Sequence, residues 1–208
     1  MVKGAVRAMD AVQDFVQTEL EKDILGFLVS GASKRGWTTW LTGATDARAT
    51  AIAPMVIDVL NMQKHMEHQI DTWGEYSEQI SDYTERGLQD HLASEAGAAL
   101  RRIVDPYHHL VYIQQPKLLM IGTNDRYWPL DSLNLSWDDL AGDKHVLYVP
   151  NNGHGLNDFQ RVIGSLNALH QMAARGKVLP KIDWSFMRDD DSLLLHVESD
   201  QPPRKVQA

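Results

Sequence analysis

The segment that most constrains the fold of this chain is residues 24–40, where an apolar run over residues 24–30 ends abruptly at Gly31-Ala32-Ser33. A stretch compatible with a helix begins directly afterwards, at Lys34. This order predicts a buried strand that turns sharply into a helix, with Ser33 at the apex of the turn. A serine in that place projects its hydroxyl beyond the end of a sheet. The backbone N–H groups of the new helix then face whatever group the hydroxyl attacks.

Apolar runs and helical periodicities alternate along the rest of the chain and predict an α/β fold. A continuous apolar run is typical of a strand buried on both faces, as at residues 24–30, and residues 49–57 predict a second buried strand. Two further strands are predicted at residues 117–122 and 144–149. Apolar side chains at steps of three and four predict helices over residues 4–20, 34–43 and 157–175. Strands that alternate with helices imply right-handed crossovers, and therefore a mostly parallel sheet.

Three segments do not follow this alternation of strands and helices. Residues 59–110 carry almost no strand pattern, so we expect two or three helices inserted between strands as a lid over the site. A short acidic helix is expected near residues 136–141. After Pro180, residues 183–186 and 193–197 predict two short strands around a turn, outside the parallel sheet.

Composition excludes several classes of function. The chain has 208 residues and a formal net charge of −8. It has no cysteine, so disulfides and thiol catalysis are excluded. With no basic cluster beyond Lys34 and Arg35, we expect no nucleic-acid partner. No apolar run approaches the roughly 20 residues of a membrane span. Residues 1–20 form an acidic, amphipathic pattern that does not resemble a signal peptide.

Three residues of the types needed for serine catalysis each follow a predicted strand. Ser33 follows the first strand, Asp125 the third and His154 the fourth, which is the chain order of α/β-hydrolases. A serine hydroxyl needs an imidazole to take its proton and a carboxylate to orient that imidazole. Because the carboxyl ends of parallel strands meet at one edge of the sheet, we expect these three side chains to converge. The backbone N–H of Lys34 is the expected oxyanion donor.

Other residues compete for some of these roles. Asp58 follows the second strand and Asp131 lies in the same loop region as Asp125, so either could orient the histidine. We prefer Asp125 because it follows its strand immediately. Arg35 stands where the usual Gly-x-Ser-x-Gly turn has its second glycine. Its charge and that of Lys34 are either solvated at the helix start, the commoner role, or placed to bind an anionic part of the substrate.

Aromatic and histidine side chains supply further candidates. Tyr127 and Trp128 directly follow Asp125 and join Arg35 as candidates to line the substrate pocket. Three tryptophans on predicted helices are more typical of a core, namely Trp37, Trp40 and Trp73. His65 and His68 lie three apart on a predicted helix, but no third ligand has a clear spacing. We therefore expect a solvated helix face there, and neither a metal nor a cofactor.

Four segments resemble one known family: residues 29–40, 54–61, 122–125 and 151–154. They are similar to the PhoPQ-activated pathogenicity-related proteins, which belong to the α/β-hydrolase superfamily, and the resemblance covers most of residues 4–180. The run Gly-Ala-Ser-Lys-Arg-Gly-Trp is quite specific to it. The resemblance implies that Ser33, Asp125 and His154 correspond to a hydrolase triad, and that Arg35 is normal for the family.

The resemblance also implies a domain organisation. Residues 1–180 correspond to the C-terminal part of an α/β-hydrolase domain, with the helical lid at about 59–110, and residues 181–208 to the start of a β-rich module. Family members are generally exported to the periplasm or secreted. They also carry strands before the nucleophile strand that have no counterpart in residues 1–23. We therefore expect a partial hydrolase fold whose exposed sheet edge promotes self-association.

The sequence thus predicts a serine hydrolase that acts on an ester, thioester or amide bond of a small-molecule or peptide substrate. Because a fold does not fix a function, two alternatives stay open. One is a non-catalytic secreted or signalling interaction protein built on a hydrolase fold, and the other is an inactive remnant of an enzyme. No sequence feature selects the substrate, and the compartment also stays open.

Overall fold

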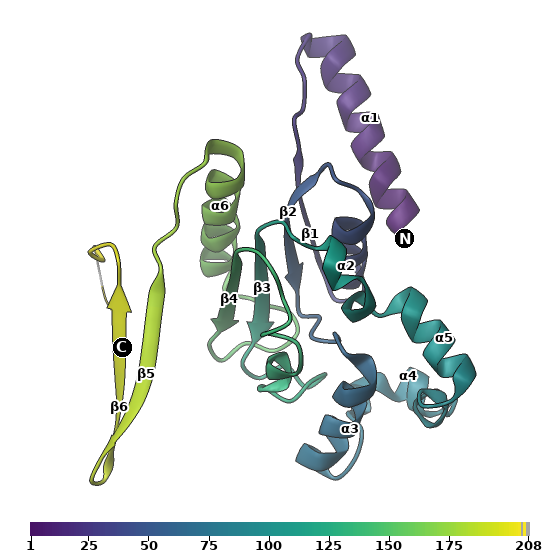
Figure 1. Cartoon of the computed structure of the whole chain (residues 1–208), viewed down its shortest axis with the longest axis vertical. Coiled ribbons are helices and arrows are strands. Elements are labelled where there is room, and N and C mark those ends of the chain that lie inside the picture. Colours follow the sequence, from purple (N-terminus) through teal and green to yellow (C-terminus); the bar gives the residue numbers. More distant parts are fainter. Residues whose placement is uncertain (205, 207–208) are drawn as a thin grey trace.

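The computed structural model describes residues 1–204 and 206, and its strands form two separate sheets (Figure 1). The larger sheet has four strands in the order β1-β2-β3-β4, and every neighbouring pair is parallel. Its strands are β1 (Phe27–Ala32), β2 (Ala49–Met55), β3 (Lys117–Gly122) and β4 (Lys144–Val149). An antiparallel hairpin follows, made of β5 (Ile182–Asp189) and β6 (Ser192–Ser199). The expected mostly parallel sheet with a short C-terminal β segment is confirmed.

The strand limits follow local chemistry. β3 and β4 begin and end at the expected residues, and all six residues of β3 are buried. β1 begins at Phe27, three residues after the start of the apolar run. Leu25, in the part of that run that lies outside the sheet, is 93% exposed. β2 ends at Met55, two residues earlier than expected. Val56 has a positive φ of 43°, which turns the chain out of the extended conformation.

Helices cover both faces of the parallel sheet (Figure 1). On one face α2 (Lys34–Thr45) packs with the short helix η3 (Pro106–Tyr112), and Trp40 lies in the same buried cluster as Leu119. On the other face α6 (Phe159–Arg175) packs Leu169 into a second cluster with Met120. Adjacent residues of β3 point to opposite faces, so both clusters rest on the same strand. α1 (Val2–Leu20) packs beside α2.

The segment between β2 and β3 is helical, as expected. It contains α3 (Met62–Trp73), η1 (Glu78–Ile80), α4 (Ser81–Thr84), η2 (Gln89–His91) and α5 (Glu95–Val104). Figure 1 places α3 and α4 beyond the arrowheads of the strands, at the edge of the sheet where the candidate site lies. None of the helices in the described part of the chain is long and apolar enough to cross a membrane.

The acidic helix expected near residues 136–141 is absent, and that prediction was wrong. A short helix, η4 (Ser132–Leu135), precedes the position instead. Beyond it, Asp139 N–H donates to the Ser136 carbonyl and Leu140 N–H to the Trp137 carbonyl. Hydrogen bonds that span three residues close turns, and no continuous α-helix follows.

Candidate active site

Ser33 occupies a strained turn between β1 and α2. Its φ of 55° and ψ of −125° lie in a region that residues with a side chain rarely adopt. The turn is fixed because Ser33 N–H donates to the Met55 carbonyl at 2.9 Å, and Trp37 N–H donates to the Ser33 carbonyl at 3.0 Å. A strained serine between a strand and a helix is the geometry of a nucleophile elbow.

The turn after Ser33 accommodates Arg35 because the residue packed closely against β2 is Gly36, one position later. Arg35 is exposed, whereas Gly36 is buried against β2. A Cβ on Gly36 would lie 2.5 Å from Cγ2 of Ile57 and 2.9 Å from the Met55 carbonyl oxygen. Lys34 is also exposed, and its amide opens α2, where the first N–H groups have no acceptor within the helix. That amide is therefore available to an external oxygen.

Asp125 and His154 are in direct contact beyond the ends of β3 and β4. His154 Nδ1 lies 2.9 Å from Asp125 Oδ2, and the Asp125 side chain is only 2% exposed. Since the carboxylate only accepts, Nδ1 carries the hydrogen, which leaves Nε2 of the neutral ring as the acceptor. This tautomer is the one that a general base acting on a serine requires.

The loops that carry these two residues are joined by hydrogen bonds. Asn124 N–H donates to the Asn152 carbonyl at 2.9 Å, and Asn151 N–H donates to Oγ1 of Thr123 at 2.9 Å. Gly122 is required at the end of β3, because a Cβ there would collide with the Asn152 carbonyl oxygen. The pairing of β3 with β4 therefore extends into both loops and sets the distance between the carboxylate and the imidazole.

Tyr127 borders the pair on one side. Its ring centroid lies 4.1 Å from that of His154 with an angle of 31° between the planes, and its N–H donates to Asp125 Oδ1 at 3.0 Å. The Nε2 atom of His154 is buried and has no hydrogen-bond partner. Within the described part of the chain, no hydrogen bond joins it to Ser33. The structure thus brings together two of the three expected triad residues in direct contact.

The rival acids contact other histidines. Asp58 is 3% exposed, and its Oδ1 lies 3.9 Å from Nε2 of His65. Burial, with added repulsion from Asp131 and Asp125, raises the pKa of Asp58 to about 7. Asp131 instead has its Oδ1 2.8 Å from Nε2 of His68, with a side chain that is 62% exposed.

The expectation of a solvated face at His65 and His68 was wrong. His65 is 0% exposed, and burial lowers its pKa to about 4. Its ring packs edge-on to Trp128, with centroids 5.6 Å apart. His65 is buried because α3 lies against the loop after β3, whereas the His68 side chain stays 24% exposed and contacts Asp131 of the same loop. Among the described residues, no group of three or more His, Asp and Glu side chains is placed to hold a metal ion.

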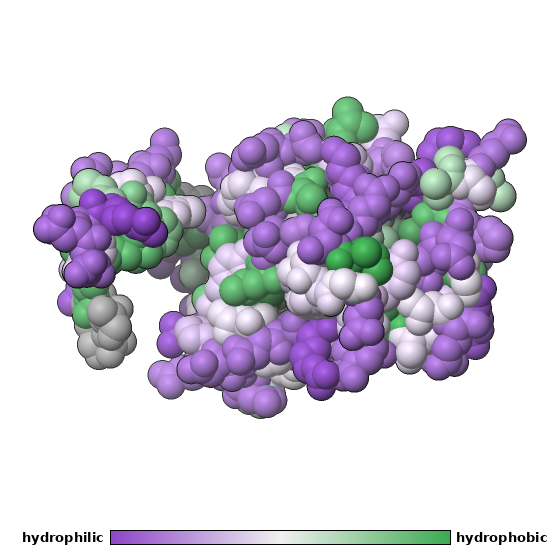
Figure 2. Space-filling model, turned by 90° about the horizontal axis from the view of Figure 1, so that it is seen from below, coloured by the Kyte–Doolittle hydropathy of each residue, from purple (hydrophilic) through white to green (hydrophobic). Residues whose placement is uncertain are grey.

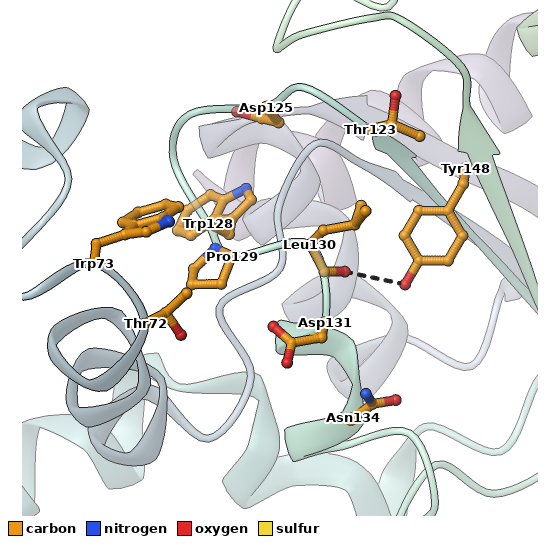
Figure 3. A pocket seen from close by; sticks show the side chains of 10 residues that line it. All are labelled: Thr72, Trp73, Thr123, Asp125, Trp128, Pro129, Leu130, Asp131, Asn134 and Tyr148. Carbon is orange, nitrogen blue, oxygen red and sulfur yellow. Dashed lines mark hydrogen bonds between the residues drawn. The ribbon is translucent and has the colours of Figure 1, made fainter.

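Two cavities flank the Asp125 loop. The larger, of about 790 Å³, is lined mostly by aromatic, acidic and small polar side chains, among them Trp73, Trp128, Asp131 and Tyr148 (Figure 3). The second, of about 400 Å³, shares Trp73 and Asp125 with the first. Of the expected pocket residues, Trp128 lines the larger cavity although it is only 8% exposed, whereas Tyr127 and Arg35 line neither.

The three tryptophans of the predicted helices follow expectation in part. Trp40 is fully buried in the core, and Trp37 donates from Nε1 to the Val104 carbonyl at 2.6 Å, which ties α2 to α5. Trp73 differs, because it lies at the end of α3, is 40% exposed and lines both cavities. Figure 3 draws it together with Trp128 among the side chains that line the larger cavity. Its position on a predicted helix did not indicate that it would line a cavity.

The architecture is similar to that of solved hydrolases. An acetyl xylan esterase from Paenibacillus sp. R4 matches with a TM-score of 0.56 and 19% identity, covering 77% of this chain and 49% of that one. A puromycin hydrolase matches with a TM-score of 0.59 and 19% identity, covering 79% of this chain and 24% of that one. At such identities the likeness shows the fold alone, and it confirms the expected α/β-hydrolase fold.

The sequence is similar to a curated protein as well. Autocrine proliferation repressor protein A from Dictyostelium discoideum is 35% identical over 194 residues, which cover 92% of this chain. The chain spans 39% of the length of that relative. The family model described as PhoPQ-activated pathogenicity-related protein matches residues 1–208, and the resemblance drawn from the sequence is confirmed. This chain belongs to the PhoPQ-activated pathogenicity-related protein family.

Proposed function

We propose that this chain carries the catalytic centre of a serine hydrolase that cleaves an ester, thioester or amide bond through an acyl-enzyme. In this proposal Ser33 is the nucleophile, His154 the general base and Asp125 the acid that orients the imidazole. The amide of Lys34 contributes one oxyanion donor. The observation that carries the proposal is the Asp125–His154 hydrogen bond at the same sheet edge as the strained turn that presents Ser33.

The proposed cycle has two acyl transfers. Ser33 Oγ attacks the substrate carbonyl carbon while its proton passes to Nε2 of His154, and the negative charge develops on the carbonyl oxygen. The tetrahedral intermediate collapses when the bond to the leaving group breaks, and the leaving group takes the proton from His154. A water molecule then attacks the acyl-serine ester with His154 again as base, which releases the acid and restores the serine.

The electrostatics of the site support these roles. The carboxylate of Asp125 is almost fully buried, so its charge acts on the imidazolium with little screening by solvent. The N-terminus of α2 supplies N–H groups and the positive end of a helix dipole beside the developing oxyanion. The buried, unpartnered Nε2 of His154 is the atom that the reaction uses.

A fluorophosphonate probe tests the proposal directly, because it phosphonylates only an activated serine. Residues 1–208 are expected to be labelled, and Ser33→Ala to be unlabelled. His154→Ala and Asp125→Asn are expected to react at least about 100-fold more slowly, the usual scale of a general-base contribution. Circular dichroism of each variant verifies that it is folded. Absence of labelling in folded wild-type protein, or equal labelling of Ser33→Ala, would contradict the proposal.

A non-catalytic interaction protein is the second candidate. Two observations favour it: no hydrogen bond joins Ser33 to His154 among the described residues, and the relative from Dictyostelium is named as a proliferation repressor. The same probe separates the two candidates. A folded protein that stays unlabelled across the pH range favours the interaction role, and a labelled one favours the hydrolase.

A further inference from the structure

We propose that Gln69 is a positioning residue of this site, which fixes the backbone of the acid loop (residues 123–131) so that Asp125 and Tyr127 hold the His154 ring. The inference rests on the proposed function, and it goes beyond it because Gln69 lies outside the triad. Gln69 is on α3, more than fifty positions before the loop in the chain, and is 0% exposed.

Three side chains form one face of α3 that lies against the acid loop. His65, His68 and Gln69 are three and four positions apart, so they project from the same side of the helix. Their partners all belong to the loop, in the order Trp128 for His65, Asp131 for His68 and the Tyr127 carbonyl for Gln69. Of the three, only Gln69 contacts the backbone of a residue that itself contacts His154.

The amide of Gln69 uses both of its ends. Nε2 donates to the Tyr127 carbonyl at 3.0 Å, and Oε1 accepts from Ser77 N–H at 2.9 Å. Ser77 in turn donates from Oγ to the Arg126 carbonyl at 2.6 Å. Two consecutive carbonyls of the acid loop are therefore held by one buried cluster. A buried network in which every member is paired defines a single local conformation, because loss of one member leaves another without a partner.

Tyr127, whose carbonyl accepts the hydrogen bond from Gln69, contacts both the Asp125 carboxylate and the His154 imidazole. Tyr127 N–H donates to Asp125 Oδ1, the oxygen that His154 does not use, and the Tyr127 ring stacks on His154. A displacement of the Tyr127 backbone therefore moves the carboxylate and the wall of the imidazole together. Displacements of about 1 Å at a reacting group can cost about 100-fold in rate.

The decisive variant is Gln69→Leu, which keeps the approximate shape of the side chain and removes both hydrogen bonds. For each folded variant, the second-order rate constant of fluorophosphonate labelling is measured from pH 5 to 9. Gln69→Leu is expected to react about 10- to 100-fold more slowly, with a shifted midpoint in its pH profile. The matched control is His68→Leu, which removes a contact between α3 and Asp131 without touching Tyr127. It is expected to stay within about threefold of wild type.

A purely structural role predicts a different result. In that case Gln69→Leu lowers the urea midpoint of unfolding, while the folded protein reacts at the wild-type rate with the wild-type pH profile. That outcome would overturn the inference. If Gln69→Leu does not fold, Gln69→Met takes its place, since its unbranched side chain follows that of glutamine, removes both hydrogen bonds and brings no charge into the buried site. It is expected to show the same loss of labelling rate.

A readout without catalysis separates this inference from the proposed function. The His154 ring proton shared with Asp125 should give a downfield NMR resonance, assigned by its loss in Asp125→Asn. We expect it in wild type and in His68→Leu, and expect it broadened or absent in Gln69→Leu. An unchanged resonance in Gln69→Leu would refute the positioning role. A wild-type protein that shows the resonance but is not labelled would refute the hydrolase alone.

Discussion

At the scale of single residues, the least expected feature is a buried acid beside a buried imidazole. Asp58 and His65 are both almost fully inaccessible, and burial moves their pKa values in opposite directions, to about 7 and about 4. The other groups that act on Asp58 are Asp125 and Asp131, and they favour its neutral form. At pH 5.5 the folded pair therefore keeps its proton on the carboxyl, whereas the unfolded chain keeps it on the imidazole.

This exchange predicts opposite pH dependences for two variants. Asp58 has a raised pKa when folded, so the folded state binds more protons and stability falls as the pH rises from about 4 to 7. His65 has a lowered pKa when folded, so stability rises from about pH 4 to 6.5. The two contributions oppose each other in wild type. In Asp58→Asn the stability should therefore rise as the pH rises, and in His65→Asn it should fall.

Urea unfolding at several pH values measures both slopes. Each is expected to amount to a few kcal/mol at most, since a tenfold change in proton affinity is worth about 1.4 kcal/mol. Wild type should show a flatter curve than either variant between pH 4 and 6.5. If both variants run parallel to wild type, the two groups do not carry the pKa values that their burial implies.

At the scale of elements, the junction of β1, α2 and β2 leaves no room for a side chain at Gly36. A methyl group on Gly36 would press on Ile57 and on the Met55 carbonyl, so α2 would have to move away from β2. Gly36→Ala is expected to lower the free energy of unfolding by about 1–3 kcal/mol. It should also slow fluorophosphonate labelling, because Ser33 is carried by the same turn.

Gly164 provides the matched control for this substitution. It also lies inside a helix, α6, but a Cβ there would have no neighbour within 4 Å. Gly164→Ala should therefore raise stability by up to about 1 kcal/mol, through helix propensity alone. Equal effects of the two substitutions in urea unfolding would show that the contact at Gly36 is not tight.

The elements differ in how far sequence alone could predict them. β3, which is buried along its whole length, and β4, an outer strand that is mostly half-buried, were both predicted to the residue, because each is a short run of strand-forming residues. The positions of Asp125 and His154 followed from those strands. The inner face of α3 could not be predicted, because His65, His68 and Gln69 are polar and their partners lie about sixty residues later in the chain. A polar stripe on a helix indicates solvent unless the loop that covers it is known.

At the scale of the whole molecule, the hairpin stands apart from the hydrolase fold. Figure 2 shows it as a separate lobe beside the body of the molecule, and every residue of β5 and β6 is exposed. Trp184 pairs with Val197 and Phe186 with Leu195, so these four apolar side chains share one face of the hairpin. β1 and β4 are the outer strands of the parallel sheet as described. We therefore predict that one of these two surfaces, the exposed sheet edge or the apolar face of the hairpin, mediates self-association.

Deletion of residues 181–208 separates these two surfaces. A two-stranded hairpin has at best marginal stability of its own, so the deletion should leave the urea midpoint of the remaining fold unchanged. By light scattering, residues 1–208 are expected to form species larger than a monomer, and residues 1–180 to shift toward the monomer, because the exposed apolar face is lost. An unchanged mass after deletion would instead assign the association to the sheet edge. A monodisperse monomer of residues 1–208 would rule out both, because neither surface would then be strong enough to bind a second chain.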